Sequence, residues 1–332
     1  MADDLANGLA EGGGPAVSAE VRTAVLRGTL GAENPLSALR GNALVWSDVF
    51  RRADAMERRA WLERNLEVAR VKGCLTYPRC PGFPEPRDLN VNMMPIKIRG
   101  LEATLPPELV GYMPMIRACL ISHCFDYPGQ TIEDHRNKVV YLTVHESHVP
   151  AGASQRRAGL HVERPGAPRD RMPAEVVRPP TMCPETGLPV NGHDENRYRM
   201  LAWGLGGYDD VRGIPVDGIY MVSNVGGTSR VWDALLNDPY EVTDAHGGFA
   251  PEDERVVRGL LGEGRTLRAG EVCWMTDRTP HESLPVSGDA YRQFFRLVVG
   301  RVSRWYSKHN TPNPRCPLPA DVEVVDEDKF AL

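Results

Sequence analysis

The sequence of 332 residues lacks any hydrophobic run long enough to cross a bilayer, and its first residues lack the basic start and apolar core of a secretory signal. We therefore expect no export and no membrane partner, and we expect the protein to be cytoplasmic. Its seven cysteines are an odd number, and no two of them have the CxxC spacing of a zinc knuckle or a redox pair. Reduced thiols and no structural zinc site are therefore expected.

Lysine is also scarce, because it supplies five of the 39 basic residues and arginine supplies the rest. The 44 acidic residues give a formal net charge of −5, and no basic block is present, which argues against a nucleic-acid partner. Glycine, with 32 residues, and proline, with 28, are abundant. Many turns are therefore predicted, which favours a β-rich or mixed fold over a helical bundle.

Two segments have apolar residues at helical spacing and predict amphipathic helices, Trp46 to Lys72 and Pro107 to Cys124. Ser47 can cap the start of the first helix, and Gly73 follows its end. The stretch from Tyr77 to Pro95 lies between them, is rich in Pro and Asn, and predicts a loop. We expect the helices to pack against a sheet as support.

Runs rich in β-branched and aromatic residues predict short strands in the second half of the chain. They lie at residues 139–144, 160–163, 218–223, 230–232, 271–275 and 293–299. The polar, Pro-rich stretch 164–199 is too long for an ordinary connection and predicts a lid or an insertion. We expect a loosely ordered segment at 1–40 and one domain at 41–332, with helical support at 44–125 and a β core at 138–301.

Two histidines lie in contexts that are typical of metal ligands. In the triplet His161-Val162-Glu163, an extended backbone would direct the imidazole and the carboxylate to the same face. Far downstream, a predicted strand ends in the corner Thr279-Pro280-His281, which supplies a third ligand. Two histidines and one carboxylate with open positions are the arrangement that non-haem Fe(II) oxygenases use.

The next strand along the chain carries two arginines. Within Tyr291 to Leu297, Arg292 and Arg296 share one face and have aromatic neighbours. An arginine on a largely apolar strand needs an anion, and its guanidinium can bind a carboxylate through two hydrogen bonds. The parity of the strand does not choose between the two arginines.

The HxE triplet, the distant histidine and the arginine on the next strand together resemble the Fe(II)/2-oxoglutarate-dependent dioxygenase superfamily, over roughly Lys138 to Arg301. The usual triplet there is HxD, and Glu is found in the clavaminate-synthase-like branch. The resemblance implies a mainly β catalytic domain with flanking helices, in which a double-stranded β-helix, or cupin-like jelly roll, is buttressed by N-terminal helices. It implies that His161, Glu163 and His281 bind Fe(II), with 2-oxoglutarate and O₂ as co-substrates.

The same resemblance implies that an arginine binds the far carboxylate of 2-oxoglutarate. Arg296 is the first choice, because its separation of fifteen residues from His281 suits the HxE branch, and Arg292 is the second. Hydroxylation with release of succinate and CO₂ is the expected outcome, and desaturation or cyclisation would need only a different placement of the substrate.

The substrate is expected to be a small polar molecule, such as an amino acid or a natural-product intermediate. The candidate substrate residues precede the triplet or lie near predicted strand ends: Gln155, Arg157, Asn224, Arg230, Trp274 and Asp277. Two alternatives stay open. One is a cupin-type metalloenzyme that does not use 2-oxoglutarate, and the other is a non-catalytic β-barrel binding protein. The sequence does not indicate an oligomeric state.

Overall fold

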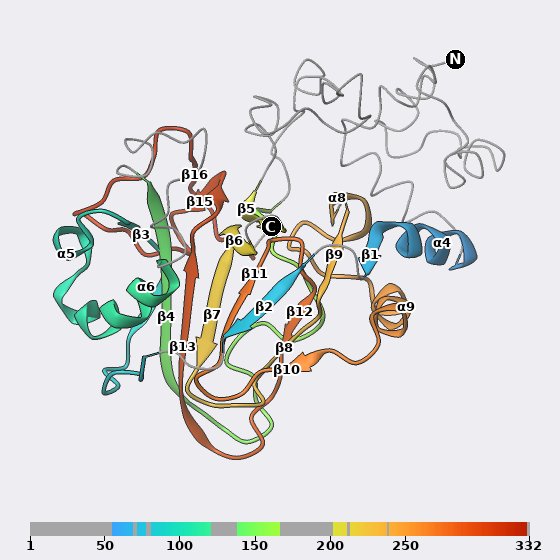
Figure 1. Cartoon of the computed structure of the whole chain (residues 1–332), viewed down its shortest axis with the longest axis horizontal. Helices are drawn as coiled ribbons and strands as arrows, with labels where there is room; N and C mark the ends of the chain where they lie inside the picture. The colour runs from blue at the N-terminus through green and yellow to red at the C-terminus, as the bar shows by residue number, and fades with distance from the viewer. Residues whose placement is uncertain are drawn as a thin grey trace.

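The computed structural model describes residues 55–68, 72–77, 81–120, 138–166, 202–210, 213–237 and 239–330. This part of the chain is mainly β, with antiparallel pairing in the central sheet and helices around it (Figure 1). The expected β-rich class with flanking helices is therefore confirmed. The double-stranded β-helix and the division into segments stay predictions, and the segments 1–40 and 167–199 lie outside the described residues.

A six-stranded antiparallel sheet forms the centre of the molecule, in the order β2-β11-β7-β13-β4-β3. Its strands are β2 (Cys74–Tyr77), β11 (Val272–Met275), β7 (Ile219–Ser223), β13 (Ala290–Val298), β4 (Val139–Val149) and β3 (Asn90–Lys97). The longest pairing joins β13 to β4, where nine residues of β13 are in register with β4. The period of two along these strands gives the sheet two different faces.

One face of the sheet packs against helices α5 (Leu101–Thr104), η2 (Pro107–Tyr112) and α6 (Met113–Leu120). Phe295 and Leu297 of β13 point into this core, and the ring of Tyr112 stacks on Phe295 with the centroids 6.1 Å apart. These helices support the sheet as expected. The alternate residues Phe294 and Arg296 are buried on the opposite face.

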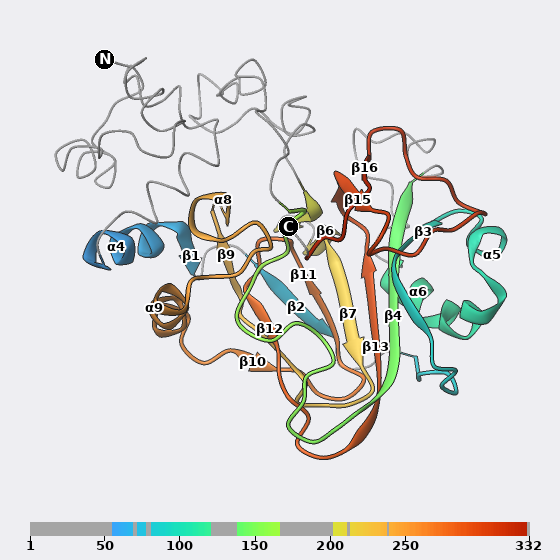
Figure 2. The same ribbon diagram turned by 180° about the vertical axis from the view of Figure 1, so that it is seen from behind.

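Small sheets and helices surround the second face (Figure 2). One three-stranded sheet consists of β10 (Arg265–Thr266), β8 (Ser229–Val231) and β12 (His281–Ser283). Another consists of β14 (Arg301–Val302), β5 (Trp203–Asp209) and β6 (Ile214–Asp217). The two-stranded sheets pair β1 (Leu66–Val68) with β9 (Ala234–Leu236), and β15 (Arg304–Tyr306) with β16 (Glu323–Val325). The remaining helices are α4 (Ala55–Asn65), α8 (Pro239–Val242) and α9 (Pro251–Leu261).

Both predicted helices are shorter than expected. In the first, α4 ends at Asn65, and the next three residues form β1, because Leu66 is buried and pairs with Leu236 of β9. In the second, a 3₁₀ helix precedes α6, and Pro114 lies in the first turn of α6. Proline has no N–H to continue the hydrogen bonds of a preceding helix, which explains the break. Residues 46–54 and 121–124 lie outside the described part.

The predicted loop from Tyr77 to Pro95 is wrong in its second half, because β3 begins at Asn90. This strand lies at the edge of the sheet, where proline is tolerated, and its register shifts between Val91 and Met94. Of the predicted strands, 160–163 is reduced to isolated bridges at His161, and the others form β4, β7, β8, β11 and β13 with small shifts at their ends.

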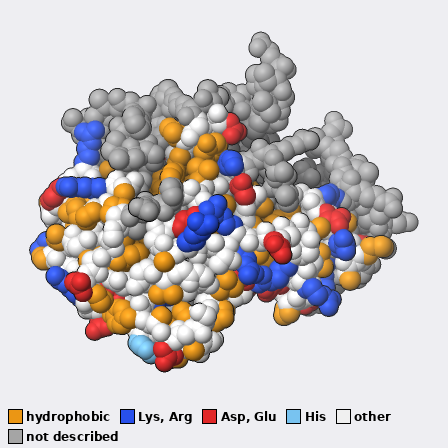
Figure 3. Space-filling model, turned by 60° about the horizontal axis from the view of Figure 1, so that its bottom comes forward, with side chains coloured by type: hydrophobic (Ala, Val, Ile, Leu, Met, Phe, Trp, Pro, Cys, Tyr) orange, Lys and Arg blue, Asp and Glu red, His pale blue; other side chains and the backbone are white. Residues whose placement is uncertain are grey.

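The face of the molecule shown in Figure 3 mixes charges of both signs. On this face, basic side chains lie beside acidic ones rather than in one patch. Among the described helices, none is long and apolar enough to cross a membrane.

Candidate functional site

His161 and His281 are neighbours in space although they are far apart in the sequence. The N–H of His161 donates to the carbonyl oxygen of His281 at 3.0 Å, and the N–H of His281 donates back to His161 at 2.9 Å. This is the hydrogen-bonded pair of an antiparallel bridge, which directs the two side chains to the same side. The centroids of the imidazole rings are 4.4 Å apart.

Hydrogen bonds to the backbone orient both imidazoles. Nδ1 of His161 donates to the carbonyl oxygen of Gly159 at 2.8 Å, and Nδ1 of His281 donates to that of Thr279 at 2.9 Å. Because a carbonyl only accepts, the Nδ1 atom of each ring carries a proton, and a ring that is neutral has its lone pair on Nε2. Burial, with His281 acting in the same direction, lowers the pKa of His161 well below its usual value. The His161 ring is therefore neutral, the state in which histidine binds metals.

The segment that carries His161 and Glu163 is extended. The N–H of Val162 donates to the carbonyl of Gly247, and the N–H of Glu163 donates to that of Asp277, both at 2.9 Å. The side chain of Val162 is buried in a hydrophobic cluster, whereas His161 and Glu163 line a pocket. The expected common direction of the two polar side chains is thus present, although the segment pairs as single bridges and not as a strand.

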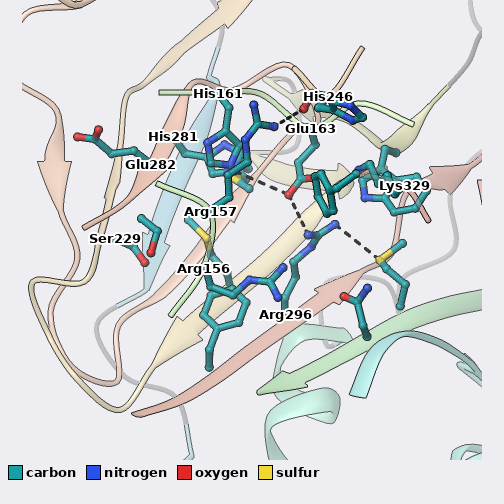
Figure 4. Close-up of a pocket in the computed structure, with 18 of the residues that line it drawn as sticks. Arg156, Arg157, His161, Glu163, Ser229, His246, His281, Glu282, Arg296 and Lys329 are labelled. Atoms are coloured by element: carbon teal, nitrogen blue, oxygen red, sulfur yellow. Dashed lines mark hydrogen bonds and ion pairs between the residues drawn. The ribbon is translucent and has the colours of Figure 1, made fainter. Parts of the chain in front are cut away.

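Glu163 already has a cationic partner. Its Oε1 is 2.9 Å from Nη1 of Arg296 and 3.7 Å from Nε2 of His281 (Figure 4). Burial opposes the charge of this carboxylate, but Arg296 and His281 outweigh it and hold the pKa of Glu163 well below its usual range. Across the described ranges, no group of three or more His, Cys, Asp and Glu side chains is arranged to hold a metal ion.

The pocket lies between the second face of the central sheet and the three-stranded sheet β10-β8-β12. It encloses about 740 Å³ of space, its open mouth included. Five of the residues singled out from the sequence line it: His161, Glu163, His281, Arg296 and Arg157. The structure therefore brings together the three expected metal ligands and the first-choice arginine.

Gln155 and Asn224 do not line this pocket. Nε2 of Gln155 donates to Oγ of Ser147 at 2.9 Å and to the carbonyl of Arg292 at 3.0 Å. Nδ2 of Asn224 donates to the carbonyl of Tyr291 at 3.1 Å. Both side chains tie loops to β4 or β13.

Arg230, Trp274 and Asp277 also lie outside the pocket lining. Nη1 of Arg230 pairs with Glu282 at 3.2 Å. Trp274 belongs to the core under the helices, and its Nε1 donates to the carbonyl of Asp217 at 2.7 Å. Asp277 is buried behind Glu163, whose N–H it accepts through its carbonyl. Closeness to a strand end did not indicate the face to which each side chain points.

The second-choice arginine, Arg292, is fully buried beside the pocket. Its Nε donates to Oγ of Ser223 at 3.1 Å and its Nη2 to Oγ of Ser229 at 3.5 Å, but its Nη1 has no hydrogen-bond partner among the described atoms. Burial, followed by repulsion from Arg156, lowers the pKa of Arg292 to about 10. A smaller pocket of about 210 Å³ contains Ser223 and shares Ser229 and Phe294 with the main one.

Several lining residues were not predicted from the sequence. Lys329 and Phe330 come from the C-terminal segment, which its composition marked only as polar and Pro-rich. His246 and His309 line the same side, and the ring of Phe330 lies 5.4 Å and 4.9 Å from theirs. Burial lowers the pKa of Lys329 to about 7, with Glu163 acting in the opposite direction. No spacing pattern connects these residues to the histidine triplet, because the paths of the loop at His246 and of the C-terminal segment bring them there.

Comparisons with known proteins give no family. No protein-family model matches the chain. No curated protein matches it either. Among solved structures, the chain is similar to one described as the "Putative Oxidoreductase from Salmonella typhimurium LT2", with a TM-score of 0.33 and 13% identity over 89% of this chain and 72% of that one. At this TM-score the likeness carries no argument about fold or activity.

Proposed function

We propose that the protein is a non-haem oxygenase that uses Fe(II), 2-oxoglutarate and O₂ to hydroxylate a small molecule. One observation carries the proposal: His161 and His281 are paired, bind backbone carbonyls through Nδ1 so that Nε2 is left for a ligand, and share one pocket with the Glu163 carboxylate. Two imidazoles and one carboxylate are the donor set that non-haem Fe(II) oxygenases use.

The three side chains have the donor types of an iron site, and one pair of them has a separation that a single ion can bridge. Two protein ligands that bind one ion at about 2.1 Å lie no more than about 4.2 Å apart. The 3.7 Å between Nε2 of His281 and Oε1 of Glu163 falls within that limit. In the proposal, Glu163 turns from Arg296 to the ion, and its depressed pKa keeps it ionised for that role.

Arg292 fits the far carboxylate of 2-oxoglutarate better than Arg296 does. It is fully buried, has an Nη1 atom without a partner among the described residues, and lies against Ser229, which lines both pockets. A buried guanidinium with an unused donor is favoured by an anion that accepts two hydrogen bonds. Arg296 pairs with Glu163 in the metal-free protein, whereas Arg292 has no carboxylate partner among the described residues, so we assign the co-substrate to Arg292.

The residues of the chain orient and protect the reaction. When bound, iron and 2-oxoglutarate would supply the oxidising chemistry: O₂ would take two electrons from the keto acid, which becomes succinate and CO₂, and two from the substrate C–H bond, which becomes C–OH. The bonds from His161 and His281 to backbone carbonyls fix the planes of the ligand rings. Arg296 holds Glu163 in place until the ligands bind, and the apolar walls at Phe294 and Trp203 exclude water. A double-stranded β-helix is the expected frame for such a site and belongs to the same proposal.

The test is an anaerobic titration of metal-free protein with Fe(II) and then with 2-oxoglutarate, followed by visible absorption. We expect saturable Fe(II) binding and then a weak charge-transfer band from the chelated keto acid. His161→Ala should lose both signals. Arg292→Met should keep Fe(II) binding but require about tenfold or more 2-oxoglutarate, because a hydrogen-bonded charge pair is removed. Arg296→Met, which changes the other arginine on the same face of β13, is the control matched to Arg292→Met.

The outcomes separate the rival functions. Fe(II) binding without the band would contradict the use of 2-oxoglutarate and favour a cupin-type metalloenzyme. If no Fe(II) bound, the oxygenase would be excluded and a non-catalytic binding protein favoured. If Arg296→Met lost the band and Arg292→Met kept it, our choice of arginine would be wrong.

A further inference from the structure

Lys329 is a buried cation that faces the pocket without an anion. Its side chain is 4% exposed, and its ammonium lies 4.0 Å from the centroid of the Trp203 ring and 5.6 Å from that of Phe330. Within the described residues, the ammonium has no hydrogen bond or ion pair. Aromatic faces attract a cation, but they do not replace the hydrogen bonds that its three N–H donors make in water.

Arg156 is a second cation on another wall of the pocket, and its side chain is half-buried. One of its Nη atoms is 3.1 Å from Nδ1 of His145, and its guanidinium lies 5.2 Å from the centroid of the Phe294 ring. Burial, together with Arg156, lowers the pKa of His145 to about 3, so the imidazole is a neutral acceptor. Among the described residues no carboxylate pairs with Arg156.

The carboxylates of the pocket are already used by other cations. Glu163 pairs with Arg296 at 2.9 Å, and Glu282 pairs with Arg230 and Arg258, which lie outside the lining. The positive charges of Lys329 and Arg156 are therefore in excess inside a partly dry space, where an uncompensated charge is costly.

We propose that Lys329 and Arg156 bind the anionic group of the substrate, which we identify as a small molecule that carries a carboxylate, a sulfonate or a phosphate. Lys329, Arg156 and Arg296 line the same pocket, and in the view of Figure 4 the Arg296 guanidinium is drawn between the other two side chains. The rings of Trp203 and Phe294 lie beside the cations and fit an apolar body next to the anion. The inference rests on the proposed function, in which Arg292 takes the 2-oxoglutarate.

The test is calorimetric titration of the metal-free full chain with inorganic sulfate, inorganic phosphate and acetate as probes. We expect saturable binding of at least one probe, and the tightest of the three indicates the anion class. Lys329→Met should weaken this binding by about tenfold or more, because a charge-assisted hydrogen bond is lost. Lys329→Arg should retain it. Lys308→Met removes an exposed lysine elsewhere and should leave it unchanged.

A second variant, Arg156→Gln, tests the proposal independently in case Lys329→Met does not fold. Arg156→Gln alters the opposite wall and should weaken binding to a similar degree. The proposal is wrong if no probe binds the wild type, or if Lys329→Met and Arg156→Gln both bind as the wild type does.

Repeating the titration anaerobically with Fe(II) and 2-oxoglutarate separates this proposal from the previous one. Simultaneous binding of the probe and the co-substrate supports a substrate subsite. Displacement of the probe by 2-oxoglutarate would assign Lys329 to the co-substrate and overturn the inference. Lys329-dependent probe binding in a protein that binds neither Fe(II) nor 2-oxoglutarate would support the anion site and overturn the oxygenase.

Discussion

The carboxyl of Asp277 is one of the most unfavourably placed groups in the described part of the molecule. It is buried directly behind Glu163, and its Oδ1 has no hydrogen-bond partner among the described residues. Burial raises the pKa of Asp277 to about 6, although Arg278 and the backbone N–H of Trp203 act in the opposite direction. The folded state therefore holds this proton more tightly than the unfolded chain does.

This raised pKa predicts the pH dependence of stability. Between the ordinary value of 3.8 and about 6, the folded state binds more protons, so the stability that Asp277 contributes at low pH is lost as the pH rises through this window. Asp277→Asn should remove that loss and be more stable than the wild type at neutral pH, by at most about 3 kcal/mol. Urea unfolding of metal-free protein from acid to neutral pH measures the difference. The exposed Asp210→Asn is the control for charge, and equal pH profiles for Asp277→Asn and the wild type would contradict the prediction.

At the scale of elements, the segment from His161 to Glu163 is positioned by a turn that approaches it closely. Gly247 has φ +86° and accepts the N–H of Val162 through its carbonyl. A Cβ atom at Gly247 would overlap the carbonyl oxygen of Val162. The turn therefore requires glycine for both its left-handed backbone and its contact with the ligand segment.

Gly247→Ala should lower the free energy of unfolding by more than the roughly 1–2 kcal/mol of the left-handed conformation alone, because the overlap adds to it. Gly270→Ala isolates the backbone contribution, since Gly270 has φ +70° and open space around its Cβ position. Chemical denaturation of both variants gives the comparison. An equal loss in the two would mean that the turn moves away from Val162 at little cost.

The sequence was informative about elements and much less so about how they meet. Runs rich in β-branched and aromatic residues indicated most of the strands of the central sheet, and the HxE triplet and His281 indicated residues that do share one pocket. Burial of Leu66 against β9 and the edge position of β3 depend on tertiary pairing, which local propensity does not encode. The sequence did not indicate Lys329 as a lining residue, because its position in the pocket depends on the path of the C-terminal segment and not on a motif.

At the scale of the whole molecule, the central sheet separates a hydrophobic core from the pocket. Phe295 is fully buried on the helix side and packs against Tyr112, while Phe294 and Arg296 face the pocket. Stability should therefore depend strongly on the helix side of the sheet.

Phe295→Ala should lower the free energy of unfolding by about 3–5 kcal/mol, because it leaves a cavity between the sheet and its helices. Val110→Ala, at a side chain that is 51% exposed on the same side of the sheet, should change it by less than about 0.5 kcal/mol. Denaturant unfolding measures both. A loss below about 1 kcal/mol for Phe295→Ala would show that the helices can collapse onto the sheet without this ring.

The alternation along β13 also limits how the protein can evolve. Its even-numbered residues from Arg292 to Arg296 lie on the pocket side of the sheet, and the residues between them lie on the helix side. Inserting or deleting one residue in this strand would exchange the two sets and bury the arginines under the helices. Divergent descendants of this chain are therefore expected to keep the length of β13 and to change specificity by substitution, with new loops added only at its ends.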